Sequence, residues 1–353
     1  MSTKDFTANV ISASKVVPDG NKTNSAASGV WDLSEHFDLV KGDNWPNVAN
    51  LAATMQIFGG RLANGSGIDS IQRITIPTTG NAVDTGDLTS VQMFNDSGGG
   101  STTRGIQAHG TNGSFQRNDI VDYTTFASTG NATDFGNLSN SRNNNNGFSN
   151  NVRFLSIGGA TGDFDSNLNY MDYFTIASTG NATDFGDTNA KAAGSGAGAS
   201  TTRGIYANGM SSVASGTATN VVEYVTIANT GNASDFGDLQ KNNVGGGGAS
   251  NSVKFLVLPS DGSNNFTVDQ FTIASTGNGT DFGDMVTTRQ YATAGASSLR
   301  VVFAGGENTS SVSSNVIQYF TIASAGNSTD FGNLNQAVKA AGSNANAHGG
   351  IPA

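Results

Sequence analysis

The tripeptide Asp-Phe-Gly is the pattern in this sequence that first suggests chemistry. It occurs five times, with its phenylalanines at Phe135, Phe185, Phe236, Phe282 and Phe331. A single Asp-Phe-Gly can hold magnesium in protein kinases, together with a glycine-rich phosphate loop and a paired lysine and glutamate. Neither partner accompanies these copies. Recurrence along one chain instead indicates a structural repeat, so we do not expect a kinase.

Aspartate recurs at one position of every repeat and is the best candidate for a metal ligand. The six residues are Asp84, Asp134, Asp184, Asp235, Asp281 and Asp330. In four repeats a second aspartate follows three residues later, at Asp87, Asp187, Asp238 and Asp284. Calcium needs six to eight oxygen ligands, and each repeat offers at most two of these side chains. We therefore expect the aspartates to accept backbone N–H bonds in turns. We predict no metal and no cofactor, with Ca²⁺ as the one ion left open.

Groups suited to acid–base or nucleophilic catalysis are few and scattered. The histidines are His36, His109 and His348, and the glutamates are Glu35, Glu223 and Glu307. The histidines lie in different parts of the chain and make neither a catalytic triad nor a zinc ligand set. The absence of cysteine excludes disulfides and thiolate metal sites. We expect that the protein is not an enzyme.

A repeat of about 50 residues organises the chain. Its marker is the glycine of a Gly-Asn or closely related turn, found at Gly80, Gly130, Gly180, Gly231, Gly277 and Gly326. Successive markers are 50, 50, 51, 46 and 49 residues apart. A fixed period of this size is typical of arrays built from one supersecondary unit. The 47 glycines and the low apolar content of 36% favour short strands and polar turns over long helices.

The last full repeat shows the elements of the unit. Residues 300–306 are a β-branched and aromatic run that ends in two glycines. Residues 317–323 alternate in the manner of a half-buried strand. Residues 325–327 supply a tight turn, and residues 329–332 a short further strand. The small residues at 291–297 give a fourth strand, which makes the unit the size of a propeller blade.

These elements predict an all-β protein, a six-bladed β-propeller of four-stranded blades over residues 51–353. Small residues would line the central channel, and the phenylalanine of each Asp-Phe-Gly would fill the space between neighbouring blades. Two segments could supply the innermost strand of the first blade: residues 336–345, which resemble the start of a seventh repeat, or residues 48–52. Closing the ring would remove free strand edges that invite aggregation.

The repeat resembles Kelch repeats. Three copies carry the double glycine of that family, at Gly59-Gly60, Gly158-Gly159 and Gly305-Gly306. The usual Kelch tryptophan is replaced by the phenylalanine of Asp-Phe-Gly, which makes this a divergent relative. The unit Thr-Ile-Ala-Ser-Thr-Gly-Asn-Ala-Thr-Asp-Phe-Gly also looks like repeat proteins of marine bacteriophages, and residues 29–46 are similar to N-terminal segments of phage tail-fibre and appendage proteins. These resemblances imply a virion component at the tail or surface.

Residues 1–50 read as an N-terminal arm with a short helix. Asp32 and Glu35 have capping-box spacing at the start of residues 28–40. The candidate docking residues around this helix are Trp31, Leu33, Phe37, Val40 and Trp45. Docking onto other virion proteins and packing into a core are both open for this segment. Docking would place multiple copies of the chain in one particle.

Charge and hydropathy limit the remaining partners. The net charge is −10 and the 17 basic residues are scattered, so nucleic acid is not an expected partner. No stretch approaches the roughly 20 apolar residues that span a membrane, so membrane insertion is not expected. The first residues show no signal-peptide pattern. We expect a virion protein that is assembled in the host cytoplasm.

The loops between the second and third strands differ most between repeats. Variable loops on a rigid scaffold often carry recognition. The residues there that could stack on or hydrogen-bond a sugar are Phe115, Arg117, Asp163, Phe164, Asp165 and Glu307. The sequence thus predicts a phage tail fibre or surface appendage that binds a host receptor glycan. The alternatives are a carbohydrate-binding lectin outside any virion and a purely structural decoration or tail-collar subunit.

Overall fold

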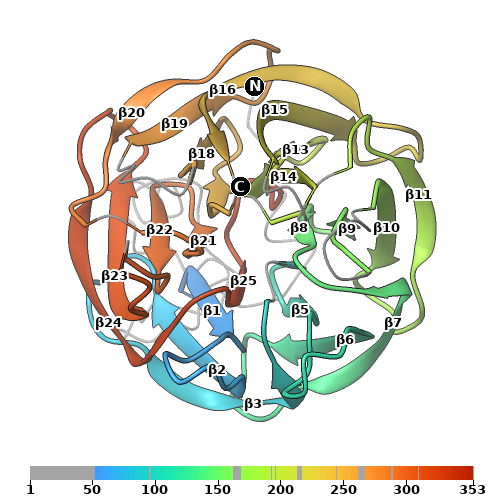
Figure 1. Ribbon diagram of the computed structural model, residues 1–353, viewed down its shortest axis with the longest axis vertical. Helices are drawn as coiled ribbons and strands as arrows, with labels where there is room; N and C mark the ends of the chain where they lie inside the picture. Colours follow the sequence, from blue (N-terminus) through green and yellow to red (C-terminus); the bar gives the residue numbers. More distant parts are fainter. Residues whose placement is uncertain are drawn as a thin grey trace, which may run out of the picture. The chain divides into compact units, whose positions relative to one another are not determined.

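A ring of six antiparallel sheets forms the described part of the chain. The computed structural model describes residues 52–94, 97–161, 168–191, 193–194, 196–212, 217–243, 245–260, 267–287, 289–308 and 310–352. Within them the sheets surround a central axis as the blades of a β-propeller (Figure 1). The predicted all-β fold and its six blades are therefore confirmed. The expected helix at 28–40 and the docking residues Trp31, Leu33, Phe37, Val40 and Trp45 lie outside the described residues.

Each blade has four main strands, which follow one another from the central axis outward. Blade 1 is β25-β1-β2-β3, blade 2 is β4–β7, blade 3 is β8–β11, blade 5 is β17–β20 and blade 6 is β21–β24. Blade 4 consists of β12, β13, β15 and β16, and the short β14 (Met210–Ser212) pairs with β15 as well.

The innermost strands are β25 (Gly342–Ala345), β4 (Gly98–Gly100), β8 (Asn146–Ser149), β12 (Ala197–Ala199), β17 (Gly248–Ser250) and β21 (Thr293–Ala296). The second strands are β1 (Thr54–Phe58), β5 (Arg104–Ala108), β9 (Arg153–Ile157), β13 (Arg203–Ala207), β18 (Lys254–Val257) and β22 (Arg300–Ala304). The third strands are β2 (Ile68–Thr75), β6 (Asn118–Thr125), β10 (Tyr170–Thr175), β15 (Thr217–Thr226), β19 (Thr267–Thr272) and β23 (Ser314–Thr321). The outer strands are β3 (Val83–Gln92), β7 (Thr133–Arg142), β11 (Thr183–Asp187), β16 (Ser234–Asn243), β20 (Thr280–Asp284) and β24 (Thr329–Val338).

The C-terminal strand closes the ring. β25 pairs antiparallel with β1, with Phe58 opposite Gly342 and Met55 opposite Ala345. Blade 1 therefore joins the two ends of the propeller, and β1 is paired on both of its edges, by β25 and by β2. Residues 336–338 end β24 instead of starting the closing strand, so only the second half of the segment 336–345 enters blade 1.

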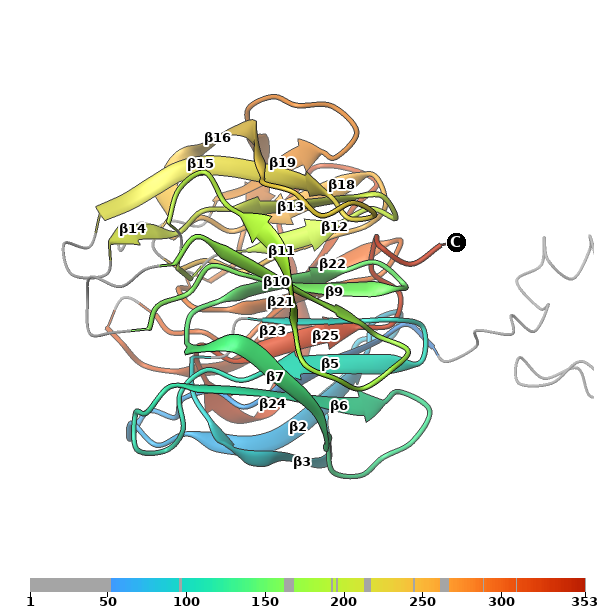
Figure 2. The same ribbon diagram turned by 90° about the vertical axis from the view of Figure 1, so that its right-hand side faces the viewer.

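The two faces of the ring carry different connections (Figure 2). The loops between the second and third strands and the links between blades lie on one side, which we call the loop face. The Gly-Asn turns and the loops between the first and second strands lie on the other side, which we call the turn face. This division follows from the antiparallel order of the strands in every blade.

Small residues allow the innermost strands to approach one another around the axis. A Cβ added to Gly99 would lie 2.6 Å from the ring of Phe154, and one added to Gly198 would lie 2.7 Å from Ser250 Oγ. Ser250 and Phe154 belong to the next blade in each case. The expectation that small side chains line the channel is therefore confirmed, because larger ones would collide with the neighbouring blade.

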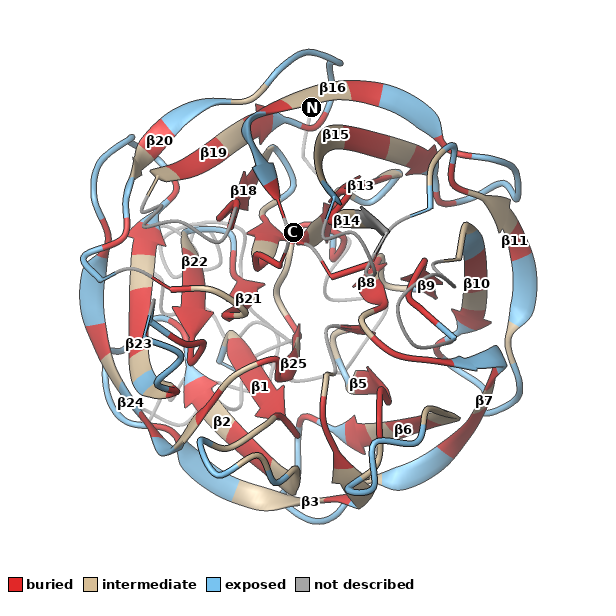
Figure 3. Cartoon of the chain, viewed as in Figure 1, coloured by how far each residue is buried: buried red, intermediate tan, exposed pale blue. Residues whose placement is uncertain are grey.

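The phenylalanine of each Asp-Phe-Gly packs against the following blade, as predicted. The ring of Phe135 in β7 lies edge-on, 5.8 Å from the ring of Phe174 in β10. Phe236 meets Phe271 in the same way at 5.9 Å, and Phe282 meets Phe320 at 5.8 Å. All five of these phenylalanines are buried, and the outer strands carry both buried and exposed residues (Figure 3). Each buried ring contributes about 1.5–3 kcal/mol to stability.

Each Gly-Asn turn also holds the outer strand of the preceding blade by three hydrogen bonds, which we call the clasp. Between blades 2 and 3, Gly180 N donates to Phe135 O at 2.8 Å and Ala182 N donates to Asn137 O at 2.8 Å. Asn181 Oδ1 accepts from Asn137 N at 3.1 Å. The same three bonds occur at all six junctions, with marker glycines Gly80, Gly130, Gly180, Gly231, Gly277 and Gly326.

The clasp explains the glycine of Asp-Phe-Gly. Gly136 has a φ of +149°, and a Cβ there would lie 2.2 Å from Gly180 O in the next blade. Only glycine fits such a close approach of two backbones. The outer strand was expected to be short, but β24 covers Thr329–Val338 and passes through a register shift against β23. The strand is longer because it continues past the shift and pairs Val338 with Ser314.

Candidate functional site

The loop face carries hairpins of one shape in blades 1, 2 and 6. Leu62 N donates to Ser66 O at 2.9 Å, Asn112 N to Gln116 O at 2.8 Å and Asn308 N to Val312 O at 3.0 Å. These three loops thus share a backbone and differ in side chains, whereas the described part of the blade 4 loop forms β14. Such a face can present different groups on one rigid frame.

The six predicted sugar-binding residues lie in different settings on these loops. Phe115 is at the tip of the blade 2 hairpin, and 53% of its surface is exposed. Arg117 is half-buried, and its backbone bridges to Thr111 at the base of the same hairpin. Glu307 is buried and forms an ion pair with Lys339. Asp163, Phe164 and Asp165 lie outside the described residues. Phe115 is therefore the candidate most open to a ligand.

Phe115 belongs to a cluster that the sequence interpretation did not include. The guanidinium carbon of Arg61, in blade 1, lies 5.6 Å from the centroid of the Phe115 ring and 5.8 Å from that of Phe94. Phe94 is in the link between blades 1 and 2. We call these three residues the arginine–aromatic cluster. It places one cation between two aromatic rings at the junction of two blades, within the range of cation–π attraction.

The backbone beneath the cluster is held by hydrogen bonds from three segments. Arg61 N donates to Lys339 O at 2.8 Å, and Arg61 O accepts from Lys339 N at 3.0 Å. Met93, the residue before Phe94, exchanges two hydrogen bonds of 2.8 Å with Thr111. Thr111 bridges in turn to Arg117. Backbone hydrogen bonds between neighbouring loops and links therefore hold the segments that carry the three cluster residues.

Two members of the cluster have a backbone conformation that large side chains seldom adopt. Phe94 has a φ of +56° and Phe115 a φ of +60°. A positive φ also occurs at the equivalent residues of the other hairpins, Gly65 and Ser311, and of the other described links, Asn144, Gly194, Tyr291 and Ala340. The left-handed region costs a residue with a Cβ roughly 1–2 kcal/mol. The frame thus sets this conformation, and at Phe115 a large side chain occupies it while 53% exposed.

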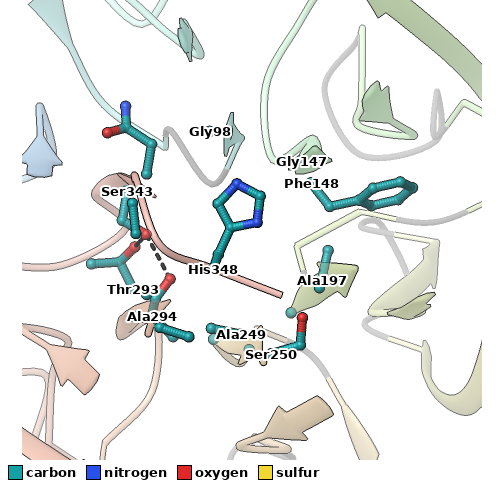
Figure 4. Close-up of a pocket in the computed structure, with 18 of the residues that line it drawn as sticks. Gly98, Gly147, Phe148, Ala197, Ala249, Ser250, Thr293, Ala294, Ser343 and His348 are labelled. Carbon is teal, nitrogen blue, oxygen red and sulfur yellow. Dashed lines mark hydrogen bonds between the residues drawn. The ribbon is translucent and has the colours of Figure 1, made fainter. Parts of the chain in front are cut away.

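The central channel of the propeller contains a pocket (Figure 4). The innermost strands line it with residues such as Gly98, Ala197, Ala249 and Ser343. Ser343 Oγ joins blades 1 and 6 by accepting from Thr293 Oγ1 at 2.7 Å and donating to Ala294 O at 2.8 Å. The cavity volume of this pocket is about 70 Å³. This volume is smaller than the few hundred Å³ of a typical ligand pocket, and it is large enough for a few water molecules.

The chain after β25 crosses the turn-face mouth of the channel. His348 Nε2 lies 3.0 Å from Gly100 O in blade 2 and 3.0 Å from Ser149 Oγ in blade 3. His348 Nδ1 accepts from Gly350 N at 3.1 Å, so the neutral imidazole carries its proton on Nε2 and donates to Gly100 O. Gly349 N donates to Ser250 O in blade 5 at 2.8 Å. Burial lowers the pKa of His348 to about 4, although the bond to the Gly100 carbonyl opposes this change.

The third strand of each blade carries one buried polar side chain at the same position, and together these six side chains form a ring. Its members are Gln72, Asp122, Asp172, Glu223, Asp269 and Gln318. Asp122 lies 2.9 Å from His109 Nε2, and Asp172 lies 3.0 Å from Arg142 Nη2. Glu223 accepts a 2.7 Å hydrogen bond from Tyr206, whose pKa is raised well above its usual range by burial and by the Glu223 charge. These groups are at most 2% exposed, so they serve packing and pairing instead of chemistry on a substrate.

The recurring aspartates partly follow the turn interpretation. Asp84 Oδ1 accepts from Gly86 N at 3.1 Å, and Asp184 Oδ1 accepts from Gly186 N at 3.2 Å. Among the described residues, no three carboxylate or histidine side chains gather in the way a metal ion requires. Nor does that part of the chain contain a helix long and apolar enough to cross a membrane.

No protein-family model and no curated protein matches the chain. The site must therefore be argued from its own residues. Arg61 and Phe94 escaped the sequence interpretation because neither is conspicuous alone. Arg61 does begin the variable loop of the first repeat, whereas Phe94 lies in a link between blades.

Proposed function

We propose that this chain is a non-catalytic binding propeller of a bacteriophage virion, in a tail fibre or surface appendage, and that its loop face recognises a host glycan. The observation that carries the recognition role is the arginine–aromatic cluster, in which a partly exposed cation lies beside the exposed ring of Phe115 and the ring of Phe94. The virion role rests on the resemblance of the repeat and of residues 29–46 to phage proteins.

The ring itself supports a scaffold role. Blades with the same clasp at every junction make a stiff body, and the buried carboxylates are bound to partners within the ring. Residues 1–50 are the proposed attachment to other virion proteins. The uniform turn face is a further surface that suits contact with another subunit.

Deletion of residues 1–50 tests the virion role. Phage assembled with the deleted chain is purified and its content of this protein is measured against full-length protein, with circular dichroism as the control for folding. We expect a folded propeller that is missing from particles. Normal incorporation would contradict the docking role of the arm. A folded propeller that binds glycans and never enters particles would favour the lectin alternative, and incorporation without glycan binding would favour a purely structural subunit.

A further inference from the structure

We infer that the arginine–aromatic cluster is a binding site for an acidic sugar residue, one that carries a carboxylate or a sulfate group. This inference rests on the proposed recognition role of the loop face and names the ligand class for it. Arg61 would bind the anionic group, and Phe115 would stack on the apolar side of the sugar ring.

Arg61 differs from the arginines that hold the ring together. Arg104, Arg153, Arg203 and Arg300 each stack on one tyrosine, at 4.3 to 4.9 Å, on the turn face. Each also donates Nη1 to one or two backbone carbonyls of the next blade. Their donors are thus used within the protein, and they act as structural ties.

The donors of Arg61 are used much less. The only hydrogen bond that its side chain makes to the described residues runs from Nε to Gly65 O, at 3.4 Å. No described carboxylate forms an ion pair with it. The two terminal amino groups therefore keep their donors for a ligand. A guanidinium edge of this kind matches a carboxylate or sulfate with two parallel hydrogen bonds.

Arg61 is partly exposed, and its guanidinium carbon lies at similar distances from the rings of Phe94 and Phe115. Phe115 is 53% exposed although it contacts Arg61, so part of its ring remains open for stacking. Aromatic side chains supply large contact area at low conformational cost, which suits a sugar face.

The backbone strain of Phe115 is not accompanied by burial of its ring. Tyr291, at the link between blades 5 and 6, has a φ of +54° like Phe94. Its ring, however, lies where a Cβ on Gly245 would be only 2.4 Å away, so packing between blades accounts for it. Phe115 has no such burial. At its position blade 1 uses glycine, and the other residue described there is Ser311.

The charge of the whole protein favours a local contact over long-range attraction. A net charge of −10 does not draw anions toward the surface. At physiological salt, charges more than about 8 Å away are largely screened. Affinity would therefore depend on Arg61 itself, and it would weaken only modestly as salt increases.

Titration calorimetry of the full-length chain tests the site with three defined probes: a carboxylated oligosaccharide (oligogalacturonate), a sulfated galactan oligosaccharide and a neutral galactan oligosaccharide. We expect binding of one or both acidic probes and at least tenfold weaker binding of the neutral one. Arg61→Ala should reduce the affinity for the acidic probes at least about tenfold. Arg61→Lys should retain only part of that affinity, because lysine cannot form the two parallel hydrogen bonds of a guanidinium. Phe115→Ala should reduce the affinity about fivefold.

Arg153→Ala is the matched control, because it removes a structural arginine from the turn face. It should lower the melting temperature and leave probe affinity within twofold. Preference for the carboxylated or for the sulfated probe would identify the anionic group. Neutral-probe binding that survives Arg61→Ala would overturn the acidic-sugar inference and leave glycan recognition standing. Failure of all three probes to bind a folded chain would overturn the inference alone, since incorporation into particles judges the virion role separately.

Discussion

The junction between blades 2 and 3 is apolar, whereas the junction between blades 1 and 2 is polar. At the first, Phe135 lies against Phe174, which stacks 5.9 Å from Phe154. At the second, Thr85 takes the place of Phe135, and Thr124 that of Phe174. Thr124 Oγ1 donates to Gln56 Oε1 at 2.7 Å and accepts from Gln107 Nε2 at 2.8 Å.

Both junctions keep the same clasp. They differ in the side chains packed between the blades, so the backbone contribution can be told apart from the side-chain contribution. Backbone hydrogen bonds fix the geometry of each junction, while aromatic packing sets how strongly it is held. The polar junction is also the one that the arginine–aromatic cluster spans on the loop face. The proposed binding site thus lies at the junction where threonines replace this pair of aromatic rings.

The largest expected contrast comes from truncating the side chain that differs. Phe135→Ala should reduce the free energy of unfolding by about 3–5 kcal/mol, because it leaves a cavity between two blades. Thr85→Ala, at the equivalent position, should reduce it by less than about 1 kcal/mol. Chemical denaturation of both variants measures the difference. Similar losses would show that the two junctions contribute equally to stability.

The clasp should matter equally at both junctions. Gly86→Ala and Gly136→Ala each place a Cβ 2.2 Å from a carbonyl oxygen of the next blade, at Gly130 and Gly180. Each variant should lose about 2–3 kcal/mol of stability from strain. Gly113→Ala is the control, because its Cβ would lie 3.6 Å from Val91, an ordinary contact. Losses that differ between the two clasp variants by more than about 1 kcal/mol would contradict a shared contribution.

The polar junction should depend on its hydrogen bonds. Thr124→Val removes the hydroxyl that joins Gln56 and Gln107 and leaves their buried amide groups without it. The expected loss is about 1–3 kcal/mol despite the gain in apolar surface. Thermal and denaturant unfolding measure it, with the exposed Thr133→Val as the control. An unchanged or higher stability would mean that packing dominates this junction too.

The two junctions also differ at the channel, where His348 joins blades 2 and 3. Its pKa is about 4 in the folded protein and about 6.5 when unfolded. Between these two pH values the unfolded chain binds more protons than the folded protein. The contribution of this group to the free energy of unfolding is therefore highest above pH 6.5 and falls as the pH is lowered toward 4. We expect about 1–2 kcal/mol less stability at pH 5 than at pH 7 from this group. His348→Ala should remove that part of the pH dependence in denaturation curves, and an identical slope in both proteins would contradict the prediction.

The sequence was informative about the ring because the ring is made of repeats. The fixed spacing of Gly-Asn turns determined the number of blades, and the alternation in residues 317–323 located the third strand. The phenylalanine between blades followed from its recurrence and size. The clasp could not be predicted, because its hydrogen bonds join residues about 45 positions apart, such as Asn137 and Asn181, whose alignment depends on the rotation between blades.

The candidate site was predicted less well, for a physical reason. Phe115 was identified because it is an aromatic residue in a variable loop. Arg61 and Phe94 are single residues in different loops, and their meeting depends on how a hairpin and a link turn. Glu307 was named on the same grounds, yet it is buried beside Lys339. Composition identifies groups that can bind, but the fold decides which of them keep free donors.

The buried ring of polar side chains has a consequence for how the protein assembles. A chain of near-identical repeats risks joining a blade to the wrong neighbour while it folds. Here Asp122 is matched by His109, Asp172 by Arg142 and Glu223 by Tyr206. A blade inserted out of sequence would separate the carboxylate of Asp172 from Arg142, which belongs to the preceding blade, and leave a charge in the interior without its counterpart. Of the three pairs, Asp122–His109 and Glu223–Tyr206 lie within one blade, and Asp172–Arg142 joins two. The charge pair at that junction thus penalises any arrangement that separates blade 2 from blade 3.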